Sequence, residues 1–325
     1  MNGCSITAEY FINHIPPGIG IGQAKAGSTW TLRMALASHE ATGLRGEHKD
    51  FIRGTQPKKR ILKKYSGKSL CNSTRFILKA PQYFPNWLAP HNMYHSLNEQ
   101  DLLWMTLRDV GSSLASNYIF RKRYKNKTFS QFVMAWVQMM KWLRQCWRTE
   151  ANQHGFKGNS VEILCSIWRN NASKLETIDR MANSKCKPLI KLQRWKSIFR
   201  QADRPIKPGP WGIDWVIPLI RYGILHGNRL LILPVQLDNM TKTDEDATFR
   251  SLYNHLHLST SQSEYTPQDH ESHRMLYPWL LDEDAEIFAR NFVQYISPLK
   301  MIARPEYPVG ARDFSAHVCG QLQPQ

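Results

Sequence analysis

The sequence of 325 residues lacks an apolar run of the ~20 residues that a membrane-spanning helix needs, and it lacks a recognisable signal peptide. It has no C-x-x-C pair, so its six cysteines predict no zinc site, and their scatter leaves the redox compartment undecided. No internal repeat is apparent. We therefore expect either a soluble cytosolic protein or a protein whose membrane anchor lies in a segment outside this sequence.

Acidic residues are scarce: 26 Asp and Glu stand against 43 Lys and Arg, for a formal net charge of +17. This imbalance favours an anionic partner, such as a nucleic acid, a membrane surface or an anionic ligand. No nucleic-acid-binding motif and no aromatic-basic repeat is present, so we expect no nucleic acid. Hydrophobic residues make up 42% of the chain, enough for the core of a folded protein.

Four glycosylation sequons are more than chance predicts for a chain of this size, and they weakly favour a secretory route. Their asparagines are Asn72, Asn126, Asn171 and Asn239.

Strand-like and helix-like segments alternate along the chain, which predicts an α/β fold with a central parallel sheet flanked by helices. The expected strands are Ile12 to Gly22, Arg75 to Ala80, Leu102 to Leu107 and Arg229 to Val235. The expected helices are Thr29 to His39, Ser112 to Arg123, Phe129 to Arg148, Trp215 to Leu225, Thr248 to Leu256 and Leu281 to Tyr295. Residues 150–210 are polar, rich in lysine and poorly periodic, and we interpret them as an insertion or a long loop-and-helix segment within a single domain spanning 1–325.

The segment Gly22 to Thr29 resembles a phosphate-binding loop with its lysine displaced. Such loops read G-x-x-x-x-G-K-[ST], and Gly22, Gly27 and Thr29 fall on that frame. Ser28 occupies the lysine position, and the only lysine of the loop is Lys25. The loop has the glycines of a phosphate-binding loop, but its lysine is at a different position. This difference predicts a nucleotide whose reacting group is not a γ-phosphate.

Two further expected strands end in cationic residues, and ligands of open α/β sheets bind at the carboxyl ends of strands. Lys79 ends the second strand, and Arg108 follows the third. Ser116 comes eight residues after Arg108, so guanidinium and hydroxyl together could hold one phosphate. For Lys79, an ordinary exposed lysine at a strand end is the competing interpretation.

The loop Gly22 to Thr29 and the segment with Arg108 and Ser116 together resemble the sulfotransferases that use 3′-phosphoadenosine 5′-phosphosulfate (PAPS). That family has a P-loop-like three-layer fold. The resemblance is firm over residues 15–120, the expected PAPS-binding half, and loose over 211–300. It implies that Arg108 and Ser116 bind the 3′-phosphate. It also implies that the 5′-phosphosulfate is bound by Lys25, Ala26, Gly27, Ser28, Thr29 and Trp30.

Other positions are similar to the Golgi, carbohydrate-acting branch of that family. Lys79 to Tyr83 resembles its Lys-x-Pro-x-Tyr segment, and Arg229 to Leu237 resembles its late strand. The chain departs from the family at Val110, usually proline, at Ser113, often arginine, and at Gln236, usually glutamate. The resemblance thus implies a carbohydrate acceptor, anionic and glycosaminoglycan-like, and a Golgi lumenal location.

Sulfuryl transfer needs a cation on the departing bridging oxygen and a base on the acceptor hydroxyl, but no metal ion. Lys25 suits the first role, and Lys79 could contact the sulfo group or the acceptor. The resemblance implies a glutamate base, for which Glu47 is the first candidate, with His48 or Asp50 as alternatives.

Two competing functions fit parts of the sequence. A non-catalytic protein that binds sulfated glycans would also use a charge of +17. A P-loop kinase is disfavoured because Ser28 replaces its lysine and no Asp-rich magnesium motif is apparent.

Overall fold

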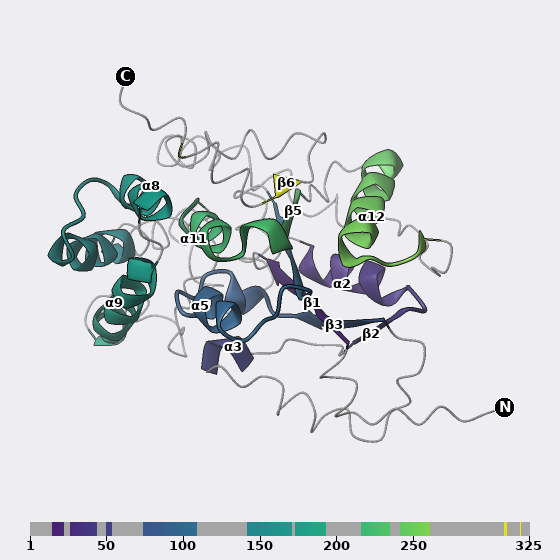
Figure 1. Ribbon diagram of the computed structural model, residues 1–325, viewed down its shortest axis with the longest axis horizontal. Helices are drawn as coiled ribbons and strands as arrows, with labels where there is room; N and C mark the ends of the chain where they lie inside the picture. Colours follow the sequence, from purple (N-terminus) through teal and green to yellow (C-terminus); the bar gives the residue numbers. More distant parts are fainter. Residues whose placement is uncertain are drawn as a thin grey trace, which may run out of the picture.

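A computed structural model of the chain describes residues 15–22, 27–43, 50–53, 74–108, 142–170, 173–192, 216–234, 241–260, 309–310 and 319 (Figure 1). Its strands are β1 (Pro17–Gly22), β2 (Ala41–Gly43), β3 (Arg75–Lys79), β4 (Leu102–Leu107), β5 (Leu230–Pro234) and β6 (Val309–Gly310). Its α-helices are α2 (Ser28–Leu36), α3 (Asp50–Arg53), α5 (Ala89–Tyr94), α8 (Ser160–Asn170), α9 (Ser173–Leu192), α11 (Val216–His226) and α12 (Lys242–Leu256). Two 3-10 turns, η1 (Pro81–Tyr83) and η3 (Gly227–Arg229), complete the described elements.

The strands form one sheet in the order β2-β3-β1-β4-β5-β6. The first five are parallel, and β6 pairs antiparallel with β5 at the edge. All four predicted strands are present, and the predicted α/β class with a central parallel sheet is confirmed. β3 and β4 are buried along their whole length, as expected for strands covered by helices on both faces.

Helices α2 and α12 cover one face of the sheet (Figure 1). Trp104 of β4 lies at the centre of this face, and its indole Nε1 donates a hydrogen bond to Thr31 Oγ1 at 3.2 Å. The ring needs the glycines of β1, because a Cβ at Gly20 would lie 2.6 Å from a Trp104 ring carbon. The glycine-rich first strand therefore makes room for a large core side chain.

Helices α5 and α11 lie on the opposite side of the sheet (Figure 1). They are joined to each other and to η1 through buried polar contacts. Tyr222 of α11 donates its hydroxyl to the Tyr83 carbonyl at 3.0 Å, and His226 Nε2 lies 2.8 Å from the Pro90 carbonyl oxygen.

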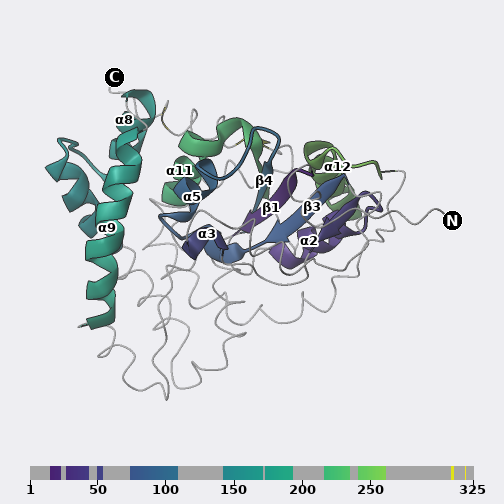
Figure 2. The same cartoon turned by 60° about the horizontal axis from the view of Figure 1, so that its bottom comes forward.

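An outer layer of helices lies beyond α11, formed by α8, α9 and a helical stretch at 142–153 (Figure 2). This layer agrees with a loop-and-helix segment for the described part of residues 150–210, but its helices have regular apolar faces where we saw little periodicity. Apolar residues of α8 and α9 recur on one buried face of each helix, while Lys174 and Lys185 of α9 are exposed. The fully buried apolar residues of these two helices include Ile163, Leu164, Ile167, Leu175, Ile178 and Ala182.

Asp179 of α9 anchors this layer through a buried network. Its Oδ1 accepts from Trp147 Nε1 at 2.7 Å and from Arg221 Nη2 at 2.9 Å, and its Oδ2 lies 2.9 Å from His91 Nε2. All four side chains are at most 2% exposed. One carboxylate thereby links α9, the 142–153 helix, α11 and α5.

Two disulfides tie down the same layer. Cys146 pairs with Cys186, and Cys165 of α8 pairs with Cys319 near the end of the chain. Cys4 and Cys71 lie outside the described residues.

Most other helix predictions can be compared with the structure. The helix predicted to start at Thr248 starts six residues earlier at Lys242, because Thr241 and Asp244 form a capping box there. The helix predicted to end at Arg148 runs on to residue 153. The predicted helices at 112–123 and 281–295, like all four sequon asparagines, fall outside the described residues. Within the described part of the chain, no helix is both long and apolar enough to cross a bilayer.

Candidate functional site

The candidate site lies at the carboxyl edge of the three central strands. β1 stands between β3 and β4, and the chain leaves β1 towards the β2-β3 side before it crosses over to β4. This reversal of strand order at β1 is a topological switch point, the place where open α/β sheets bind ligands. Thr29, Lys79 and Arg108 all come from this edge.

The described end of the loop opens helix α2. Gly27 is its N-cap residue, with φ 76°, a left-handed conformation that glycine adopts without strain. The first bond of the helix runs from Thr31 N to the Gly27 carbonyl at 3.0 Å. Within the described residues no side chain caps this helix, so its first-turn N–H groups and its dipole favour an anion at this point.

Lys79 is drawn into this edge rather than exposed, which contradicts its interpretation as an ordinary strand-end lysine. Its side chain is 6% exposed, and Nζ donates to Thr29 Oγ1 at 2.7 Å. Lysine is seldom buried without an anionic partner or a function. The contact brings together two predicted residues that are fifty positions apart in the sequence.

Arg108 follows β4 directly and is only 5% exposed. The register of the sheet places it relative to the loop: Gly22, the last residue of β1, is paired with Thr106 of β4. Arg108 therefore stands two residues beyond the point where the phosphate-type loop leaves the sheet.

Trp30, which the resemblance assigns to the 5′-phosphosulfate site, packs against α12. Its indole lies in the core between α2 and α12, is 7% exposed, and donates through Nε1 to Glu245 Oε1 at 3.2 Å. The ring is therefore a core side chain, and its partner Glu245 lies in the first turn of α12. Ser28, by contrast, is the first residue of α2 and is buried at the edge itself.

Thr106 is a residue at this edge that sequence reasoning missed. Its hydroxyl is buried, makes no hydrogen bond within the described part of the chain, and would overlap a Cβ placed on Gly22. The signal in the sequence was a single hydroxyl within the otherwise apolar strand Leu102–Leu107.

Of the remaining predicted site residues, Asp50 lies in the described part of the chain. Asp50 opens the short helix α3, whose Phe51 carbonyl accepts from Asn92 Nδ2 at 2.7 Å. Lys25, Ala26, Glu47, His48 and Ser116 lie outside the described residues. The described residues contain no group of three His, Cys, Asp or Glu side chains that could hold a metal ion.

Comparison with known proteins assigns no family to this arrangement. No protein-family model matches the chain, and no curated protein matches its sequence. The function is therefore argued from the geometry of the site.

Proposed function

We propose that the chain is a PAPS-dependent sulfotransferase with a P-loop-like fold that acts on a hydroxyl of an anionic carbohydrate. The observation that carries the proposal is the contact of Lys79 Nζ with Thr29 Oγ1 at the N-terminus of α2. A buried ammonium group beside a helix N-terminus that no described side chain caps concentrates positive charge at one point of the carboxyl edge. Arg108, two residues past the partner of Gly22, adds a second cation at that edge.

In the proposed reaction the sulfur–oxygen bond to the 5′-phosphate of PAPS breaks as the acceptor oxygen bonds to sulfur. The leaving adenosine 3′,5′-bisphosphate carries the electron pair on its phosphate oxygen, and Lys25 neutralises it. The backbone N–H groups of the first turn of α2 hold the 5′-phosphate, together with the hydroxyls of Ser28 and Thr29. The acceptor proton passes to Glu47, or to His48 or Asp50 in its place.

Lys79 and Arg108 have separate roles in this proposal. Lys79, held by Thr29, is oriented towards the transferred sulfo group and neutralises its oxygens during transfer. Arg108 and Ser116 bind the 3′-phosphate, which distinguishes PAPS from nucleotides that lack it.

We also propose a Golgi lumenal location. The disulfides Cys146–Cys186 and Cys165–Cys319 favour an oxidising compartment, and the four sequons point the same way.

The test is transfer of labelled sulfate from PAPS to a panel of glycans, combined with thermal shift by adenosine 3′,5′-bisphosphate. We expect turnover with at least one anionic glycan, and a shift that Arg108→Ala removes. A wild-type protein that the bisphosphate does not stabilise would overturn the cofactor assignment. Salt-sensitive glycan binding without turnover would instead identify a non-catalytic binding protein.

A further inference from the structure

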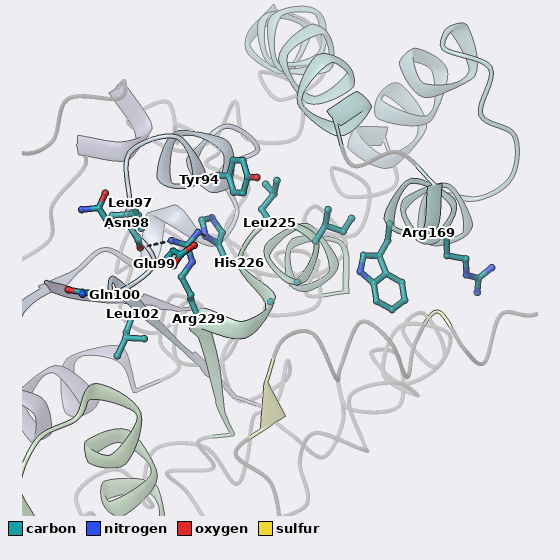
Figure 3. A pocket seen from close by; sticks show the side chains of 14 residues that line it. Tyr94, Leu97, Asn98, Glu99, Gln100, Leu102, Arg169, Leu225, His226 and Arg229 are labelled. Atoms are coloured by element: carbon teal, nitrogen blue, oxygen red, sulfur yellow. Dashed lines mark hydrogen bonds between the residues drawn. The ribbon is translucent and has the colours of Figure 1, made fainter.

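A broad pocket of about 1430 Å³ lies at the amino-terminal edge of the sheet (Figure 3). It is bordered by the segment that leads into β4, by the last turn of α11 and by the end of α8. Leu102, the first residue of β4, lines it, whereas Arg108 follows the last residue of the same strand. A six-residue strand spans ~20 Å, so this pocket is separate from the carboxyl edge.

One wall of the pocket presents an aromatic ring to solvent. Tyr94, at the end of α5, is 51% exposed and is the one large hydrophobic side chain so exposed in the described ranges. Its ring makes an edge contact with the buried His226 ring at 6.2 Å between centroids, which fixes its orientation. An exposed aromatic ring held in place at a pocket wall is a platform for the apolar face of a ligand.

The floor of the pocket supplies polar groups in fixed positions. Arg229 Nη1 donates to the Asn98 carbonyl at 2.6 Å, and Nη2 lies 3.4 Å from His226 Nδ1 (Figure 3). The guanidinium has five N–H groups, so it can still donate to a ligand while held this way. Glu99 and Gln100 follow Asn98 in the wall and offer further acceptors and donors.

This combination suits a saccharide better than a small inorganic anion. The C–H face of a sugar ring packs against an aromatic ring, and its hydroxyls bond to amide, carboxylate and guanidinium groups. The pocket exceeds the ~300–1,000 Å³ typical of drug-sized ligands, so it has room for several sugar units. The lining residues include two arginines, Arg169 and Arg229, and one acid, Glu99. This excess of positive charge favours a ligand with negative charge.

We propose that this pocket is a second binding site, for an anionic oligosaccharide, at the edge of the sheet opposite the transfer site. The choice of a saccharide over other anionic organic ligands rests on the proposed function. The site would hold a distant part of a polymeric acceptor or product.

The test measures binding of a chondroitin sulfate hexasaccharide to the full chain by calorimetry, in the presence of saturating adenosine 3′,5′-bisphosphate. We expect Tyr94→Ala to weaken binding about fivefold and Tyr94→Phe to leave it unchanged, because the ring and not the hydroxyl carries the contact. Glu99→Gln is expected to strengthen binding about twofold at low salt, because it removes a like charge. Inorganic sulfate and the desulfated hexasaccharide, as separate ligands, are each expected to bind more weakly than the sulfated one.

Arg250→Ala is the matched control, since Arg250 is exposed on α12 on the other face of the sheet. Equal weakening by Arg250→Ala and Tyr94→Ala would mean diffuse charge attraction and would overturn the site. Unchanged binding in Tyr94→Ala would overturn it as well. If the protein transfers no sulfate but binds the hexasaccharide in a Tyr94-dependent way, the proposed function is wrong and the saccharide site is still supported.

Discussion

At the scale of single residues, the carboxyl edge depends on cations that are buried rather than exposed. Lys79 and Arg108 are each at most 6% exposed, whereas Lys157, Lys174, Lys185 and Lys242 are exposed. Burial holds such groups in one position and strengthens their interaction with a charged ligand, since less water screens them. A side chain fixed before the ligand arrives costs less entropy when the ligand binds.

We predict that Lys79→Met lowers kcat for sulfate transfer about 100-fold, because the positive charge that the lysine holds beside the transferred sulfo group is lost. The affinity for adenosine 3′,5′-bisphosphate, which has no sulfo group, is expected to change by less than about threefold. Single-turnover kinetics and calorimetry measure the two quantities. If the bisphosphate affinity fell as much as kcat, Lys79 would belong to nucleotide binding instead.

At the scale of elements, the sheet and the outer helical layer are held together by polar contacts as well as by apolar ones. Arg221 of α11 lies between two indole rings, 5.3 Å from the centroids of Trp87 and Trp147, while it pairs with Asp179. Loss of one partner from such a network leaves a buried charge uncompensated, which costs more than the pair itself contributes.

Asp179→Asn is therefore expected to lower the free energy of unfolding by about 3–5 kcal/mol, measured by urea denaturation. Glu176→Gln is the matched control on the same helix, because Glu176 pairs with His95 and Arg180 near the surface. That change is expected to cost at most about 1 kcal/mol. Similar losses of unfolding free energy in both variants would show that the buried network stabilises the fold no more than the ion pairs near the surface.

At the scale of the whole molecule, buried neutral histidines make stability depend on pH. Burial lowers the pKa of His226 to about 3, a shift that the hydrogen bond to the Pro90 carbonyl opposes and that Arg229 and His91 reinforce. Burial also lowers the pKa of His255. The unfolded chain gains protons on these rings below pH ~6.5, but the folded chain does not. The contribution of His226 is fully present above that pH and declines as the pH falls towards 3, and the lowered pKa of His255 acts in the same direction.

We predict that His226 alone lowers the free energy of unfolding by about 2 kcal/mol between pH 7.5 and pH 5. Urea denaturation at pH 7.5, 6.5 and 5 measures the dependence, and His226→Gln is expected to flatten it. An identical slope in the variant would assign the dependence to other groups.

The elements that could be predicted were those whose signal is local. β4 was predicted with the bounds Leu102–Leu107 because a short run that is apolar except for Thr106 is typical of a buried strand. Helices α8 and α9 were not predicted individually, because their buried faces are defined by contacts with α11 and α5, which a local pattern does not show. The three-residue strand β2 is too short to carry a pattern at all.

For the site, the sequence by itself determined the residue types: glycines, hydroxyls and displaced cations at the ends of parallel strands. Only the tertiary structure decided which of them meet. It joined Lys79 to Thr29, and it packed the Trp30 ring in the core beside α12. The physical reason is that a motif fixes neighbours along the chain, whereas contacts across fifty residues follow from strand order and register, which depend on the whole sheet.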